Sequence, residues 1–186
     1  MWKGKKYSGR PTMKNGLIFE NKTKLSDLLN KHPSFSVDDN KVYFNNDEVG
    51  LIVSQNKLYR WLDEVNPNWK NLTNKTLNPD EALLNKTNNT LYIIEKKYQE
   101  TEGSVDEKLQ TFHFKIWFYE KITKDLKINI DFAYLLSDWF FEKKYTQGWR
   151  EGTLKYQEIL DYLDLNNINV FRKEIPLDYL FPNMNL

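Results

Sequence analysis

Hydrophobic residues recur with two different periods along the chain, and each change of period marks an expected element. Residues 15–30 carry apolar positions at near-helical spacing, which predicts a helix. Residues 34–53 form short apolar runs separated by polar turns, which predicts short strands. Ser54 is a suitable N-cap for the next helix. An irregular segment over 67–78 and a β-hairpin over 79–99 follow it.

The second half of the chain has the same mixture of patterns. The remaining predicted elements are a helix over 104–123, an inner strand over 128–136, a helix over 153–165 and an edge strand over 169–175. Ser104 and Glu107 form a capping box at the start of the first of these. This order of elements predicts an α/β fold of α+β character, with a mixed central sheet flanked by helices. We expect one domain over residues 1–186.

The composition is that of a folded chain. Hydrophobic residues make up 40% of the 186 residues and aromatic residues 15%, which excludes disorder as a description of the whole chain. No apolar run approaches the roughly 20 residues that a membrane span needs, so we expect no membrane partner. The net charge of +1 does not exclude a DNA partner, because phosphate binding depends on the local charge of a surface.

Cysteine and histidine counts restrict the possible metal chemistry. The chain has no cysteine and two histidines, which removes thiolate sites and multi-histidine sites. Any bound metal must therefore be held by oxygen ligands, which favours Mg²⁺ or Mn²⁺.

One group of charged residues stands out in the predicted hairpin. Pro79-Asp80 begins the first strand, and Glu95-Lys96-Lys97 lies on the second. Glu95 and Lys97 are two residues apart on a strand, so their side chains share one face, and the hairpin brings Asp80 beside Glu95. Two carboxylates and a backbone carbonyl can hold Mg²⁺, and a nearby lysine can orient water and offset charge on a phosphorus centre.

The alternative interpretation is a set of surface charges. Glu-x-Lys arises often by chance in a chain with this many lysines. Here, however, an apolar strand leads directly into Glu95, and buried charges reduce stability unless they are paired or functional.

These residues resemble the motif of the PD-(D/E)xK nuclease superfamily. The similarity consists of PD at 79–80, IIEKKYQ at 93–99 and GSVDEKLQTFHFKIWFYEKI at 103–122. The segment EKKYQETEGSVDEKLQ is similar to that of small bacterial type II restriction endonucleases. The resemblance implies a restriction-endonuclease-like fold, a Mg²⁺ cofactor that Mn²⁺ can replace, and a bacterial cytoplasmic protein.

The resemblance also implies residue roles. Asp80 and Glu95 match the metal-binding acids, the Lys96 carbonyl matches a backbone metal ligand, and Lys97 matches the catalytic lysine. Glu20, in the N-terminal helix, matches an additional acid of many family members, although a solvated helix acid explains it equally well.

Four further residues are candidates for contact with substrate. Gln99 follows Lys97 on the same face and is predicted to reach the scissile phosphate or its neighbour. Lys108, near a helix start beside the site, is predicted to bind a phosphate. Trp149 and Arg150 lie in a glycine-flanked loop, where arginine can read a guanine edge and where the pair can equally be a packing lid.

Three functions remain open at this stage. The first is a type II restriction endonuclease, which cleaves double-stranded DNA at a fixed sequence. It is expected to be a homodimer, because one site cuts one strand, and to have a cognate DNA methyltransferase in the same system. The second is a structure-specific nuclease of the same fold, such as a junction resolvase or a repair or transposition nuclease. The third is a non-catalytic DNA-binding protein.

Overall fold

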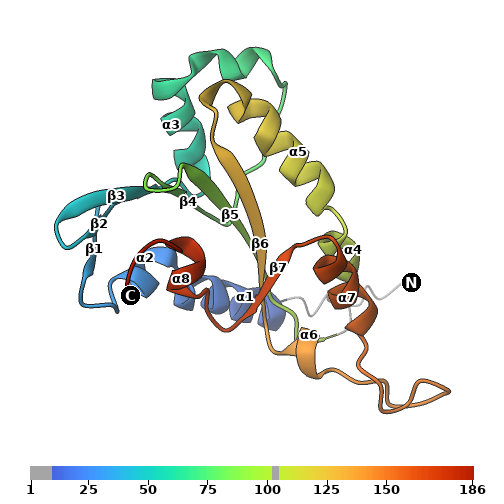
Figure 1. Ribbon diagram of the computed structural model, residues 1–186. Helices are drawn as coiled ribbons and strands as arrows, with labels where there is room; N and C mark the ends of the chain where they lie inside the picture. The colour runs from blue at the N-terminus through green and yellow to red at the C-terminus, as the bar shows by residue number, and fades with distance from the viewer. Residues whose placement is uncertain (1–9, 102–104) are drawn as a thin grey trace, which may run out of the picture.

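A single mixed sheet forms the centre of the protein (Figure 1). The computed structural model describes residues 10–101 and 105–186. Seven strands follow one another across the sheet in chain order. They are β1 (Phe35–Asp38), β2 (Lys41–Phe44), β3 (Asp47–Ile52), β4 (Glu81–Asn85), β5 (Thr90–Lys97), β6 (Asn129–Leu136) and β7 (Asn169–Arg172).

The sheet changes from antiparallel to parallel at β5. Strands β1 to β5 pair antiparallel, whereas β5–β6 and β6–β7 pair parallel. The parallel pairs need crossovers, which the helical segments between the strands provide. The carboxyl ends of β5, β6 and β7 therefore meet at one edge of the sheet.

Helices cover both faces of the sheet. One face packs against α1 (Arg10–Lys22), α2 (Leu25–Leu29) and α8 (Leu177–Leu180), with Leu25, Leu29 and Leu180 fully buried. The other face packs against the remaining helices and single turns. These are α3 (Asn56–Val65), η1 (Pro67–Asn71), α4 (Val105–Leu109), α5 (Phe112–Thr123), η2 (Lys124–Leu126), α6 (Trp139–Glu142) and α7 (Gln157–Leu165).

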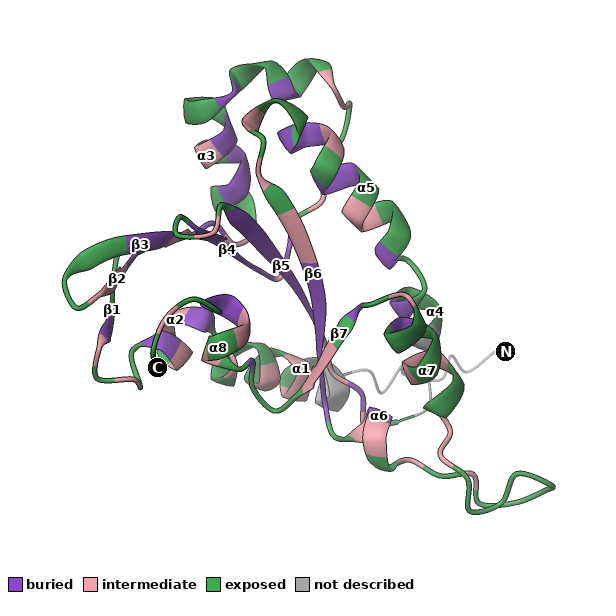
Figure 2. Cartoon of the chain, viewed as in Figure 1, coloured by how far each residue is buried: buried purple, intermediate pink, exposed green. Residues whose placement is uncertain are grey.

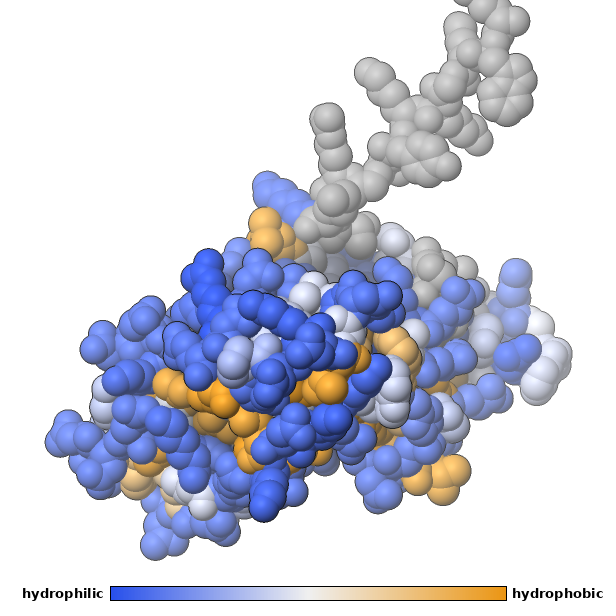
Figure 3. All heavy atoms as spheres, turned by 90° about the horizontal axis from the view of Figure 1, so that it is seen from above, coloured by the Kyte–Doolittle hydropathy of each residue, from blue (hydrophilic) through white to orange (hydrophobic). Residues whose placement is uncertain are grey.

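Burial is greatest along β4, β5 and β6, between the two helical layers (Figure 2). Alternate residues of β5 enter the two cores: Leu91 and Ile93 face α3 and α5, and Tyr92 and Ile94 face α2 and α8. From above, the surface is mostly hydrophilic, and hydrophobic side chains form a band across it (Figure 3).

This architecture confirms the predicted fold class, a mixed sheet flanked by helices. The hairpin over 79–99 and the edge strand β7 are both present. The segment predicted to be irregular over 67–78 begins with the 3₁₀ helix η1, and only residues 72–78 lack regular secondary structure. Among the described residues, no helix has the length and apolar character needed to cross a membrane.

Two predicted helices are each divided in two, and a threonine lies at both breaks. Thr23 separates α1 from α2, and its hydroxyl donates to the Phe19 carbonyl at 2.8 Å. Thr111 separates α4 from α5, and its hydroxyl donates to the Lys108 carbonyl at 2.7 Å. Side-chain bonds of this kind compete with the helical hydrogen-bond ladder. Ser104 of the predicted capping box lies outside the described residues.

Two predicted helix starts are wrong. Ser54 does not cap α3, because its hydroxyl donates to the Glu81 carboxylate at 2.7 Å and accepts the Ala82 N–H at 3.0 Å. The last long helix begins at residue 157 and not at 153, because Lys144 and Leu154 form an antiparallel bridge just before it.

Candidate functional site

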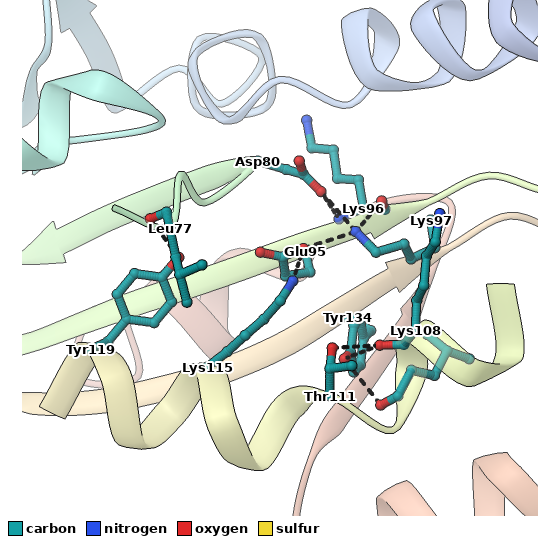
Figure 4. Close-up of polar contacts among 11 residues, drawn as sticks. Leu77, Asp80, Glu95, Lys96, Lys97, Lys108, Thr111, Lys115, Tyr119 and Tyr134 are labelled. Atoms are coloured by element: carbon teal, nitrogen blue, oxygen red, sulfur yellow. Dashed lines mark hydrogen bonds and ion pairs between the residues drawn. The ribbon is translucent and has the colours of Figure 1, made fainter. Parts of the chain in front are cut away.

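The hairpin of β4 and β5 brings the three motif side chains together. Glu81 pairs with Ile94, so Asp80, one residue before β4, lies opposite Glu95. Glu95 and Lys97 project toward α5, and Lys96 projects through the other face of the sheet (Figure 4). The alternation that was predicted from the two-residue spacing is therefore observed.

The Lys97 ammonium is surrounded by oxygen atoms. Its Nζ donates to Asp80 Oδ2 at 3.1 Å, to Glu95 Oε2 at 2.8 Å and to the Lys96 carbonyl at 3.0 Å. The Lys96 N–H also donates to Asp80 Oδ2, at 2.8 Å. These are the two acids and the carbonyl that the resemblance assigns to a metal ion, and they converge on one positive charge.

A second lysine, which the sequence analysis missed, also contacts Glu95. Lys115 of α5 places its Nζ 2.5 Å from Glu95 Oε2 (Figure 4). The Glu95 side chain is only 4% exposed, so both lysines neutralise a buried carboxylate. The sequence did contain a signal for this contact. Buried Phe112, Phe118 and Tyr119 lie three or four residues from Lys115, so helical spacing places Lys115 on the same buried face of α5.

Electrostatic effects keep Lys97 charged. Burial alone would lower the pKa of Lys97, but the carboxylates of Glu95 and Asp80 raise it above its ordinary value. Burial, and then the nearby Glu95 carboxylate, raise the pKa of Tyr119 and of Tyr134 beneath the site. In this state Lys97 is therefore a cation and hydrogen-bond donor, and the two phenols are neutral.

The segment that leads into Asp80 is fixed by two tyrosines. The Leu77 carbonyl accepts hydrogen bonds from the Tyr59 hydroxyl at 2.5 Å and from the Tyr119 hydroxyl at 3.1 Å. The Leu77 N–H donates to the Tyr59 oxygen at 2.6 Å, and the Pro79 carbonyl accepts the Gln55 N–H at 3.0 Å. This irregular segment consequently places Asp80 without regular secondary structure.

The Lys96 side chain has its own partners on the opposite face. The side chain is 2% exposed, and its ammonium donates to Glu81 Oε1 at 2.8 Å and to the Glu20 carbonyl at 3.2 Å. Glu81, which the sequence analysis did not single out, joins Lys96 and Ser54 in one network. This network connects α1 to the hairpin.

Glu20 and Gln99 are not brought to the Lys97 ammonium. The Glu20 side chain is exposed, and only its backbone carbonyl contacts Lys96. Gln99 is buried beyond the end of β5, where its amide donates to the Thr101 carbonyl at 2.8 Å and to the Tyr156 hydroxyl at 3.1 Å. To contact a phosphate as predicted, the Gln99 amide would have to give up its hydrogen bonds to Thr101 and Tyr156.

The three predicted DNA contacts are all exposed. Lys108 lies in the last turn of the short helix α4, so the argument from a helix start does not apply to it. Trp149 is 89% exposed, and the Arg150 guanidinium stacks on the Trp149 and Tyr145 rings at 4.6 and 4.9 Å. The segment between α6 and α7 that carries this pair projects from the body of the protein (Figure 1).

The donor set fits a hard divalent cation. Asp80, Glu95 and the Lys96 carbonyl supply only oxygen atoms, and all three already surround a positive charge. Within residues 10–101 and 105–186, no three acidic, histidine or cysteine side chains gather as a metal site. The protein side of this site is thus two carboxylates and one carbonyl.

Comparison with known protein families agrees with this geometry. The PD-(D/E)XK nuclease superfamily domain matches residues 26–121, which include both strands of the hairpin, Lys97 and Lys115. The chain belongs to the PD-(D/E)XK nuclease superfamily. This superfamily membership supports a nuclease, and PD-(D/E)XK nucleases generally use divalent metal ions. No curated protein and no solved structure matched the chain.

Proposed function

We propose that this PD-(D/E)XK protein is a Mg²⁺-dependent endonuclease that hydrolyses phosphodiester bonds in double-stranded DNA at a fixed sequence, as a type II restriction enzyme does. The observation that carries the proposal is the convergence of Asp80, Glu95 and the Lys96 carbonyl on the Lys97 ammonium. A homodimer and a cognate DNA methyltransferase belong to the same proposal.

Each residue has a defined part in this reaction. Asp80, Glu95 and the Lys96 carbonyl would hold Mg²⁺, which polarises the phosphodiester and makes a bound water more acidic. Lys97 donates hydrogen bonds to the phosphate oxygens, where negative charge develops in the transition state. Lys115 keeps the Glu95 carboxylate oriented toward the site.

A plasmid digest tests the proposal directly. Purified protein and a mixed-sequence plasmid are incubated with Mg²⁺, with Mn²⁺, with Ca²⁺ and with EDTA, and the ends of the products are sequenced. We expect cleavage at one sequence with Mg²⁺ or Mn²⁺, binding with little cleavage in Ca²⁺, and no cleavage in EDTA. Full activity in EDTA would show that the metal dependence is wrong.

A second substrate separates the proposal from the other nuclease function. A four-way DNA junction and a linear duplex of the same sequence are digested in parallel. A restriction enzyme cuts both wherever its site occurs in duplex form. Preferential cutting at the branch point would instead indicate a structure-specific nuclease.

A further inference from the structure

A hollow lined mostly by polar residues lies beside Asp80, which forms part of its wall. It has a volume of about 440 Å³ and lies between the starts of α2, α3 and β4. Three cationic side chains line it, Lys24, Lys57 and Arg60, and all three residues are exposed. The hollow therefore opens to solvent on the side of the hairpin where Asp80 lies.

The charges in this hollow are not balanced locally. The two acids that line it have other partners: Asp80 binds Lys97, and Glu81 binds Lys96 and Ser54. Among the described residues, none of the three cations forms an ion pair. A region of excess positive charge thus borders the carboxylate that leads into the site.

We propose that this hollow binds a backbone phosphate of the DNA strand close to the phosphate that is cut, through Lys24, Lys57 and Arg60. This inference rests on the proposed function, because it assumes duplex DNA as the substrate. Contacts to backbone phosphates fix the position of the DNA on the protein and carry no sequence information. These cations would therefore position the duplex at the site without reading its bases. Arginine can contact a phosphate with two parallel hydrogen bonds, and lysine acts as a point charge.

The salt dependence of DNA binding measures these contacts. A fluorescent duplex that carries the mapped cleavage site is titrated in Ca²⁺ at several salt concentrations. The double variant Lys57→Gln/Arg60→Gln should bind on the order of a hundredfold more weakly, because two charged hydrogen bonds are lost and each is worth about tenfold. The slope of log affinity against log salt should fall in magnitude by about 1.8, or about 0.9 for each lost contact.

A control double variant removes two charges elsewhere. Lys124→Gln/Lys127→Gln changes two exposed lysines that follow α5, and it should keep the wild-type slope. The conservative variant Lys57→Arg should also keep it. Thermal unfolding checks that each variant is folded, and the control variant Lys124→Gln/Lys127→Gln should also cut DNA at nearly the wild-type rate.

The possible failures are distinguishable. If the wild type binds and cuts duplex DNA while Lys57→Gln/Arg60→Gln keeps the full salt slope, the hollow does not bind phosphate and only this inference is wrong. If the wild type neither binds nor cuts duplex DNA, the proposed function is wrong and this inference falls with it.

Discussion

Lys97 is the residue on which the proposed chemistry depends most directly. Its ammonium donates hydrogen bonds to both acids, and in the proposed mechanism it would act mainly in the transition state, where charge on the phosphate increases. We expect Lys97→Ala to lower the single-turnover cleavage rate by on the order of a hundredfold or more. The affinity for the DNA site, measured in Ca²⁺, should stay close to wild type.

The control for Lys97 is another lysine of the same hairpin. Lys86 lies in the turn between β4 and β5 and pairs with Glu48 at the surface. Exposed pairs of this kind contribute little, so Lys86→Ala should cut at nearly the wild-type rate. A Lys97→Ala protein that cuts as fast as Lys86→Ala would remove the main support for the catalytic assignment.

Lys115 supports the same carboxylate from the helix α5. Removing it leaves the buried Glu95 with Lys97 as its remaining ion-pair partner among the described residues. We expect Lys115→Gln to lower the cleavage rate by about tenfold, the value of one hydrogen bond to a charged group. Lys115→Arg keeps the charge and should recover part of the rate. Unchanged cleavage by Lys115→Gln would mean that Lys97 alone orients Glu95.

The Lys96–Glu81 pair predicts an effect on stability. Lys96→Met leaves the Glu81 carboxylate in a buried position without its cation, which should lower the free energy of unfolding by roughly 3–5 kcal/mol. Lys96→Met/Glu81→Leu removes both charges and should regain most of that loss. Urea unfolding of Lys96→Met, of Glu81→Leu and of the double variant measures the coupling energy between the two side chains. Losses of stability that simply add would contradict this prediction.

This pair also changes the interpretation of Lys96. The resemblance assigns only the Lys96 carbonyl to the site, and this carbonyl does contact Lys97. The side chain does indeed project to the opposite face, but it is buried and paired there. A loss of activity in Lys96→Ala would therefore mix folding with chemistry, and Lys86→Ala is the cleaner control.

At the scale of elements, the hairpin was the most predictable part of the protein. An apolar strand that becomes charged at Glu95 is visible in the sequence, and the two-residue period places Lys97 on the same face. Asp80 could be placed because a hairpin pairs neighbours in the chain. Helical spacing could place Lys115 on the buried side of α5, but the contacts of Lys115 and Glu20 with the hairpin depend on how the helices pack against the sheet.

The helix boundaries were less predictable, for a physical reason that the threonines show. Apolar spacing continues across Thr23 and across Thr111, so periodicity alone predicts unbroken helices. The hydroxyl of each threonine instead bonds a carbonyl of the preceding turn. Ser54 is similar: its hydroxyl binds buried Glu81, which lies 27 residues away, in preference to the nearby helix start.

At the scale of the whole molecule, the position of the site suggests how DNA would approach. Asp80, Lys97 and the hollow lined by Lys57 and Arg60 lie at the end of the hairpin. The projecting segment with Trp149 and Arg150 comes from a different part of the chain, between α6 and α7. If a duplex binds at Asp80 and the hollow, the segment with Trp149 and Arg150 would have to extend into a groove of that duplex to contact base edges.

A homodimer is the prediction that belongs to this scale. The protein has one set of Asp80, Glu95 and Lys97, and under the proposed function one such set would cut one strand. Cutting both strands of a symmetric site in one binding event needs two copies related by a two-fold axis. Light scattering on the DNA complex should give twice the chain mass of 22.4 kDa, plus the mass of the duplex. A complex with one copy, together with nicked circles that persist during plasmid digestion, would show that the strands are cut independently by a monomer.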